Sequence, residues 1–248
     1  AWKIAMLHIP SKMLLAIETP YSEMGRGDLK VGDGKIVFIG GAPSLPMSVV
    51  QIDLASSKWW ELRKSNNLEI DDGYLSTAQP VEFPTENGQT AHAFYYPPKN
   101  GDFDGPAGEK PPLLVKSHGG PTGSASTALD LGIQFWTSRG IGVLDVNYGG
   151  STGYGREYRE RLNGAWGIVD VDDCCNAALH MVAQGNADPD RLAIDGGSAG
   201  GYTTLAALTF KEVFKAGASH YGVSDLEALA KETHKFESRY LDGLVAPY

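Results

Sequence analysis

The sequence has no long hydrophobic run, no excess of positive charge and no pattern of metal ligands. No apolar stretch among the 248 residues approaches the roughly 18 that a transmembrane helix needs, so we expect no membrane span. The formal net charge of −9 argues against a nucleic-acid partner, which would require a basic face. No two histidines have the spacing of a zinc site and no Cys-x-x-Cys occurs, so we expect no metal.

Cysteine is also scarce, because Cys174 and Cys175 are the only two and they are adjacent. Neighbouring side chains in a helix point apart, so a disulfide between them would be strained. We therefore expect free thiols that pack in a core, as is typical of a soluble protein in a reducing compartment, the cytoplasm or an organelle stroma. No signal peptide is recognisable and the first residue is Ala, so the sequence is expected to start at a processed or clipped end.

Two regions of the chain differ in their hydrophobic pattern. Residues 1–78 contain short alternating apolar segments separated by turn residues, for example 35–39 and the segments that flank Ala55–Ser57. This pattern predicts an antiparallel meander, similar to one blade of a β-propeller and a fragment of another. A small β-domain that is complete in itself is the alternative.

From residue 79 strands alternate with helical segments, which predicts an α/β fold with a mostly parallel sheet. We expect an opening antiparallel pair at 80–83 and 91–96, strands at 113–117, 141–147, 192–195 and 216–220, and helices near 130–138, 170–183, 199–211 and 225–236.

The most informative segment is the run Gly-Gly-Ser-Ala-Gly at 196–200, which follows a short strand and precedes a helical stretch. Strand, Gly-x-Ser-x-Gly and helix together are the sequence form of a nucleophile elbow, with Ser198 as the nucleophile. Gly196 and Gly200 must lack side chains, because the residues two before and two after the serine crowd each other on a sharp turn. A glycine-rich turn with an incidental serine, as in a dinucleotide loop, is the plainer alternative.

A second motif, His-Gly-Gly-Pro at 118–121, directly follows the strand at 113–117. In α/β-hydrolases one oxyanion N–H comes from the residue after the nucleophile, and another often comes from the loop after the third strand. The predicted oxyanion hole therefore consists of the backbone amides of Ala199 and Gly120, since Pro121 has no N–H.

Taken together, the motifs resemble the prolyl oligopeptidase family of serine peptidases, and most closely its acylaminoacyl-peptidase and dipeptidyl-aminopeptidase-like branch. The resemblance begins near residue 80 and is carried by four motifs in one order, His118–Pro121, Asn147–Gly155, Trp166-Gly167 followed by Asp170, Asp172 and Asp173, and Gly197–Tyr202. It implies an α/β-hydrolase domain at 79–248 preceded by a β-propeller remnant at 1–78. It also implies no cofactor and the hydrolysis of short peptides through an acyl-enzyme on Ser198. In branches with a tyrosine at the position of His118 the phenol serves the oxyanion hole, and the histidine here favours the Gly120 amide instead.

The chain departs from this family in its catalytic base. The order of the triad in this fold is Ser, then Asp or Glu, then His, and too few residues follow Ser198 for the last two. We therefore expect the acid and the histidine in a C-terminal third that the sequence lacks. The expected partners are a short peptide substrate and either that C-terminal segment or a second copy of the chain.

Histidines within the chain are weak candidates for the base. His220 is expected at a strand end near the rim of the site, packed or hydrogen-bonded, and His234 at the surface. His118, Asp145 and Ser198 occur in the order of the chymotrypsin triad. We reject this arrangement because His118 lies beside the oxyanion loop and Asp145 lies inside an apolar strand.

Two further features have both a structural and a functional interpretation. Asp170, Asp172 and Asp173 suit a helix N-terminus, where carboxylates are favoured, and a metal site is the alternative. The loop at 147–155 follows a strand on the side where ligands bind in such sheets, so it could line the pocket or simply form a turn.

The function that the sequence favours is that of a serine peptidase. A carboxylesterase or lipase is the enzymatic alternative, because the elbow and the His-Gly-Gly loop also serve esters. An inactive fragment or structural subunit that keeps the fold without its base is the other alternative. The propeller-like first region favours the peptidase.

Overall fold

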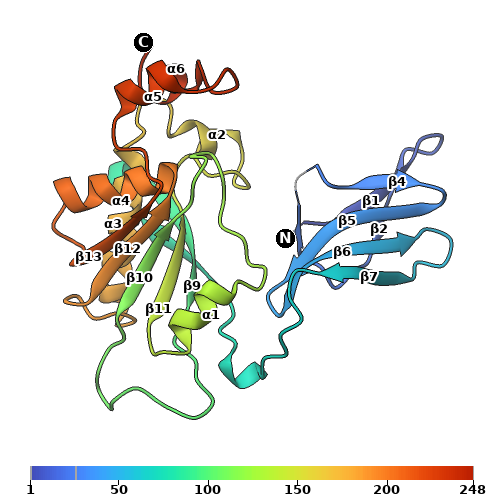
Figure 1. The fold of residues 1–248 in the computed structure, drawn as a ribbon, viewed down its shortest axis with the longest axis horizontal. Coiled ribbons are helices and arrows are strands. Elements are labelled where there is room, and N and C mark those ends of the chain that lie inside the picture. The colour runs from blue at the N-terminus through green and yellow to red at the C-terminus, as the bar shows by residue number, and fades with distance from the viewer. Residues whose placement is uncertain (1, 26, 248) are drawn as a thin grey trace. The chain divides into compact units, whose positions relative to one another are not determined.

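A computed structural model describes residues 2–25 and 27–247 (Figure 1). The chain divides into two compact units, the first comprising Ala1–Thr77 and Ser126–Gly132, and the second comprising Ala78–Ala125 and Ile133–Tyr248. Among the described residues, no helix combines the length and the apolar character that crossing a membrane requires.

The described residues of the first unit form mainly antiparallel strands joined by turns. Strands β1 (Ile4–His8) and β2 (Met13–Ile17) form a hairpin. A five-stranded sheet has the order β3 (Glu23–Met24), β5 (Lys35–Ala42), β6 (Leu45–Asp53), β7 (Trp59–Lys64), with β4 (Lys30–Gly32) also paired to β5. The predicted meander is thus confirmed, while its place in a propeller stays a prediction. A single-turn helix, η1 (Asp72–Tyr74), follows the sheet.

The core of this first unit is formed by every second side chain of its strands. Successive side chains of a strand point to opposite faces, and Ser48, Val50 and Ile52 of β6 are buried while their neighbours are half-buried. Val50 and Ile52 join a cluster with Ile36 and Phe38 of β5.

The segment 126–132 packs in this first unit, although the sequence pattern places it with the second region. The backbone N–H of Leu129 donates to the carbonyl of Ala42 at 2.9 Å, and the hydroxyl of Thr127 donates to Glu23 at 2.7 Å. The buried Ala128 lies against Gly41, where a Cβ atom would come within 3.1 Å of the alanine methyl.

The second unit contains a six-stranded mixed sheet with the order β13-β12-β10-β11-β9-β8. The four strands β10 (Leu113–Ser117), β11 (Gly142–Asn147), β12 (Leu192–Gly197) and β13 (Ala216–His220) are parallel. Strands β8 (Gln79–Pro84) and β9 (Thr90–Tyr96) form the predicted antiparallel pair at one edge, joined by the turn η2 (Glu86–Gly88). The predicted α/β arrangement with a mostly parallel sheet is confirmed.

Helices cover this sheet on both faces. The α-helices in the described residues are α1 (Leu131–Thr137), α2 (Arg156–Glu160), α3 (Val169–Ala183), α4 (Ala199–Phe210), α5 (Leu226–Glu232) and α6 (Tyr240–Leu244) (Figure 1). Leu113 and Val115 of β10 pack in the large cluster that contains side chains of α3 and α4, whereas Leu114 packs with Ile133 of α1. Successive side chains of β10 therefore point to opposite faces of the sheet and pack in two separate hydrophobic clusters. Both Cys174 and Cys175 are buried free thiols on α3, as predicted.

One helix prediction is wrong in its extent. The expected helix over 225–236 is helical only in α5, where Asp225 caps the N-terminus by accepting from the N–H of Ala228. The chain then turns and forms α6. The apolar pattern could not show this interruption, because the half-buried Leu226 and Leu229 of α5 and the buried Leu241 and Leu244 of α6 are spaced alike, three residues apart.

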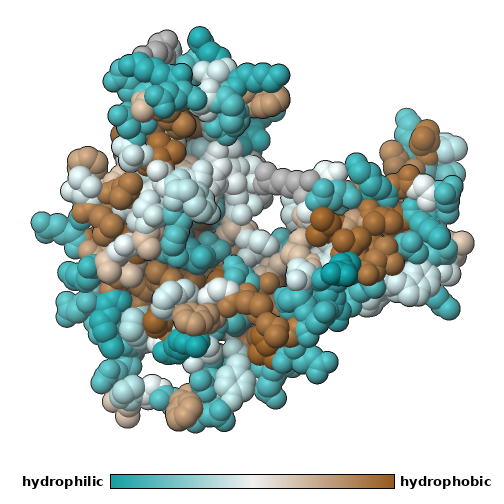
Figure 2. Space-filling view, in the orientation of Figure 1, coloured by the Kyte–Doolittle hydropathy of each residue, from teal (hydrophilic) through white to brown (hydrophobic). Residues whose placement is uncertain are grey.

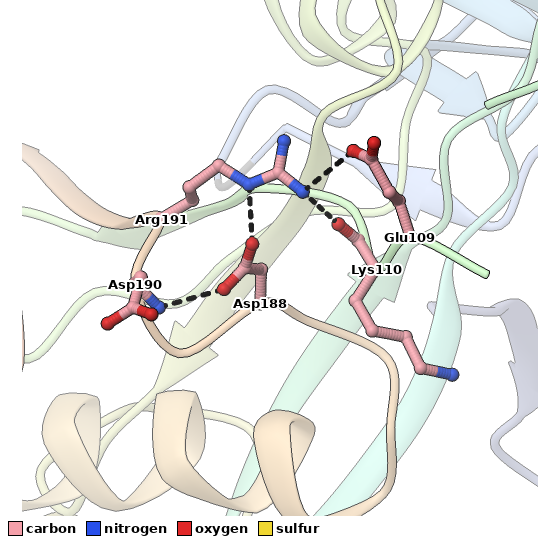
Figure 3. A network of polar contacts seen from close by, with 5 residues as sticks. All are labelled: Glu109, Lys110, Asp188, Asp190 and Arg191. Carbon is pink, nitrogen blue, oxygen red and sulfur yellow. Dashed lines mark hydrogen bonds and ion pairs between the residues drawn. The ribbon is translucent and has the colours of Figure 1, made fainter. Parts of the chain in front are cut away.

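The loop at 100–110 lies on the surface, as predicted, and one arginine anchors its end (Figure 3). Arg191, just before β12, contacts Asp188 at 2.6 Å and Glu109 at 3.5 Å, and it donates to the carbonyl of Lys110 at 2.6 Å. This network lies at the amino end of β12, whereas Ser198 follows its carboxyl end.

Apolar side chains also reach the surface (Figure 2). In the second unit Leu205, Leu208 and Phe210 of α4 are exposed, and all five residues of the edge strand β13 are exposed. An open edge of this kind offers unpaired backbone groups to another strand.

Candidate active site

Ser198 occupies the turn between β12 and α4. Its backbone has φ 56° and ψ −120°, a positive φ that a residue with a side chain seldom adopts. The turn is fixed by backbone hydrogen bonds, since the N–H of Ser198 donates to the carbonyl of His220 at 3.0 Å and the N–H of Val223 donates to the carbonyl of Ser198 at 3.3 Å. The side chain is exposed rather than enclosed in the helix. This is the strained strand-to-helix geometry that the sequence predicts.

The glycines around Ser198 are required by close backbone contacts. A Cβ atom at Gly196 would collide with the carbonyl oxygen of Gly200, and one at Gly200 would collide with the carbonyl oxygen of Ser117. The hydroxyl of Ser117 donates to the carbonyl of Gly200 at 2.9 Å and so ties the end of β10 to the elbow. The elbow and the loop after β10 therefore lie in direct contact.

The two sequence motifs meet at a small cavity of about 80 Å³. Gly120 and Ser198, which are far apart in the sequence, both line it, and so does Ala199. A Cβ atom at Gly119 would lie 3.4 Å from the Cβ of Ser198. Gly120 has φ 125°, which only glycine adopts without strain. Ala199 is the first residue of α4, so its N–H has no acceptor within the helix. That these two amides bind an oxyanion stays a prediction.

The other wall of the cavity includes two residues of the sequence motifs, Pro121 and Trp166, and six residues that the sequence did not single out for the site. The six belong mainly to the C-terminal helices and the segments beside them, and they are Val223, Leu229, Thr233, Glu237, Tyr240 and Leu241. The apolar spacing of Tyr240, Leu241 and Leu244 is the one signal that could have indicated a packed helix there.

Three histidines are candidates for the base, and the structure shows the surroundings of each. His118 contacts Ser151 through Nε2 at 2.7 Å and the carbonyl of Gly119 through Nδ1 at 2.9 Å, which agrees with rejecting it as the base. His220 lies at the end of β13, as predicted, with Nε2 3.3 Å from Asp195 and with an exposed side chain. His234 is exposed, also as predicted. Within residues 2–25 and 27–247, the Ser198 hydroxyl has no hydrogen-bond partner, and the location of the base stays a prediction.

The three aspartates at the start of α3 bind protein groups. Asp170 accepts hydrogen bonds from the N–H of Gly167 at 2.6 Å and from the hydroxyl of Thr203 at 2.5 Å. Asp173 accepts from the N–H of Gly149 at 2.7 Å, and Asp172 forms an ion pair with Lys211 at 2.6 Å. Because Thr203 lies on α4, Asp170 connects the helix of the elbow to α3.

Asp170 makes the stability of the protein depend on pH. Burial raises its pKa to about 6, with hydrogen bonds from Thr203 and Gly167 acting against the shift. A carboxyl whose pKa is raised in the folded state stabilises the fold fully below its unfolded pKa of 3.8, and this contribution is lost as the pH rises through 6. Asp170→Asn can accept from Gly167 through its amide oxygen and donate through its amide nitrogen to the Thr203 hydroxyl, which also contacts the carbonyl of Ala199. This variant should raise the free energy of unfolding at pH 8 by up to about 3 kcal/mol. Thermal unfolding of the full-length protein between pH 4 and 8 measures this, and an unchanged pH profile would contradict it.

Comparisons with known proteins find similar peptidases. Residues 127–247 match the family described as the prolyl oligopeptidase family. A dipeptidyl aminopeptidase BIII of Pseudoxanthomonas mexicana is 34% identical over 229 residues, which are 89% of this chain and 33% of that protein. An acylamino-acid-releasing enzyme of Arabidopsis thaliana is 38% identical over 39% of this chain and 13% of its own length.

Solved structures extend the similarity to nearly the whole chain. A puromycin-hydrolyzing peptidase of Mycobacterium tuberculosis superposes with a TM-score of 0.96 at 48% identity, over 99% of this chain and 37% of that chain. A puromycin hydrolase superposes with a TM-score of 0.90 at 42% identity, over 98% of this chain and 37% of that chain. The chain thus spans about a third of the length of these relatives. By its motifs, its fold and these similarities, the chain belongs to the prolyl oligopeptidase family.

Proposed function

We propose that Ser198 is the nucleophile of a serine peptidase that hydrolyses short peptides. The observation that carries this proposal is the exposed serine at φ 56°, which shares a cavity with Gly120 and Ala199. The Ser198 oxygen attacks the scissile carbonyl, and the oxyanion that forms accepts hydrogen bonds from the amides of Gly120 and Ala199. The amine leaves with a proton, and water then hydrolyses the acyl-enzyme.

Proton transfer in these steps needs a general base. We propose that a histidine and its partner acid lie in protein beyond these 248 residues, because the Ser198 hydroxyl has no partner within the described part of the chain. Support for an added segment comes from β13, whose open and exposed edge can pair with a further strand. A second copy of the chain could use the same edge.

The substrate class follows from the cavity and from the relatives. Trp166, Val223, Leu229 and Leu241 supply apolar surface beside Ser198, which suits an apolar side chain of a peptide. The named relatives are a dipeptidyl aminopeptidase, acylamino-acid-releasing enzymes and puromycin hydrolases. We further propose that residues 1–78 are part of a β-propeller and that 79–248 are the α/β-hydrolase domain without its C-terminal third.

An esterase is the alternative that the elbow alone permits. Turnover of a peptide amide and of a p-nitrophenyl ester by the full-length protein, with Ser198→Ala as the control, separates the two. The peptidase proposal requires amide hydrolysis that is lost in the variant. Ester turnover without hydrolysis of any peptide amide would favour the esterase, and no turnover at all would favour the inactive subunit.

A further inference from the structure

The first residue after β11, Tyr148, has a buried side chain that reaches the loop beside Ser198. Its hydroxyl lies 2.8 Å from the carbonyl oxygen of His118 and 3.0 Å from that of Pro121. A phenol has one proton, so it donates to one of these carbonyls or shares the proton between both. The two carbonyls flank Gly119 and Gly120, the residues that face the nucleophile.

These two glycines are the part of the loop with the greatest conformational freedom. Glycine loses more freedom on folding than any other residue, and Gly120 adopts φ 125°. In a planar trans peptide the C=O of one residue and the N–H of the next point in opposite directions. The direction of the Gly120 N–H is therefore set by the Gly119 carbonyl, which the Nδ1 of His118 contacts at 2.9 Å.

Tyr148 and His118 support each other in this arrangement. Their rings are stacked with centroids 4.3 Å apart. The other ring nitrogen of His118 contacts the hydroxyl of Ser151 at 2.7 Å, and this hydroxyl donates to the backbone carbonyl of Tyr148 at 2.7 Å. A closed set of contacts thus joins the loop after β10 to the loop after β11.

The phenol stays a donor over the pH range in which a peptidase works. Burial, followed by the charge of Asp170, raises the pKa of Tyr148 well above its ordinary value. The Tyr148 side chain is fully buried, so its hydroxyl is shielded from bulk water.

We propose that Tyr148 is a positioning residue for the oxyanion hole, because its hydroxyl fastens both ends of the Gly119–Gly120 segment next to Ser198. The inference rests on the proposed function, since it assigns a role in the same reaction. Tyr148 does not reach the substrate and acts through the backbone of the loop.

The test is Tyr148→Phe in the full-length protein, which keeps the ring and its stacking and removes the hydroxyl. We expect kcat for a peptide amide to fall about 10- to 100-fold while KM stays within about twofold, because the oxyanion forms only in the transition state. The affinity for a peptidyl boronic acid, whose tetrahedral adduct occupies the oxyanion hole, should fall by a similar factor. If the role of Tyr148 were purely structural, the variant would have a lower melting temperature, but kcat would not fall selectively at constant KM.

The matched control is Tyr158→Phe. The hydroxyl of Tyr158 is also buried and also donates to a backbone carbonyl, that of Asn147 at 2.6 Å, but it does not contact the loop at 118–121. We expect Tyr158→Phe to lose about as much stability as Tyr148→Phe and to keep the wild-type kcat and boronate affinity.

The results distinguish failure of the proposed peptidase function from failure of the role inferred for Tyr148. A wild-type protein that neither hydrolyses peptides nor reacts with a fluorophosphonate refutes the proposed function. An active wild type with unchanged kcat and boronate affinity in Tyr148→Phe refutes the inference alone. If that variant does not fold, Ser151→Ala is measured in the same way, with a smaller loss of kcat at constant KM expected, and unchanged values there also refute the inference.

Discussion

Replacement of Ser198 by alanine is expected to abolish peptide hydrolysis while leaving the fold intact. The exposed hydroxyl is the only part removed, and it makes no hydrogen bond in the part of the chain that the structure describes. Removal of the nucleophile of a serine hydrolase lowers kcat by roughly 10⁴- to 10⁶-fold, because the acyl-enzyme can no longer form. Steady-state hydrolysis of a chromogenic peptide amide by the full-length protein measures the effect.

A serine in the first unit provides the control for this variant. Ser56 is exposed and bonds only within its own turn, so Ser56→Ala should keep wild-type turnover. The melting temperature of Ser198→Ala should equal that of the wild type within about a degree or two. Wild-type activity in Ser198→Ala would mean that another residue performs the chemistry.

The second large effect is expected at Gly200. An alanine here would place its Cβ against the carbonyl oxygen of Ser117 and 2.9 Å from that of His118. These are backbone atoms at the end of β10, which cannot move without moving the oxyanion loop. We expect Gly200→Ala to lower the free energy of unfolding by about 3 kcal/mol or more and to remove activity in whatever protein still folds.

Gly243→Ala is the matched control for this substitution. A Cβ atom at Gly243 in α6 would meet no atom within 4 Å, so the variant should be neutral or more stable by up to about 1 kcal/mol. Thermal unfolding and the rate of fluorophosphonate labelling check both variants. Equal stability and reactivity of Gly200→Ala and the wild type would show that the elbow is not built as described.

Local patterns in the sequence were sufficient for the framework of the second unit. The buried strand β10 and the edge strand β13 have the predicted bounds. Prolines precede β10 and glycines follow it, and Gly222 follows the end of β13. The elbow could be predicted for a related reason, since backbone crowding leaves glycine as the only residue that fits at 196 and 200.

The remaining features depend on contacts between distant residues. The interruption between α5 and α6 brings Tyr240 to the cavity, and its hydroxyl contacts Thr122 at 2.9 Å. The segment at 126–132 packs in the first unit through hydrogen bonds to Glu23 and Ala42, which no local pattern indicates. The role of Tyr148 likewise follows only from the position of its hydroxyl.

Mass spectrometry of the full-length protein after reaction with a fluorophosphonate tests the central assignment most directly. Peptide mapping should find one adduct, on Ser198, and an excess of a peptide substrate should slow its formation. A preparation that hydrolyses peptides but carries no adduct at Ser198, or carries it on another residue, would contradict the assignment of this serine as the nucleophile.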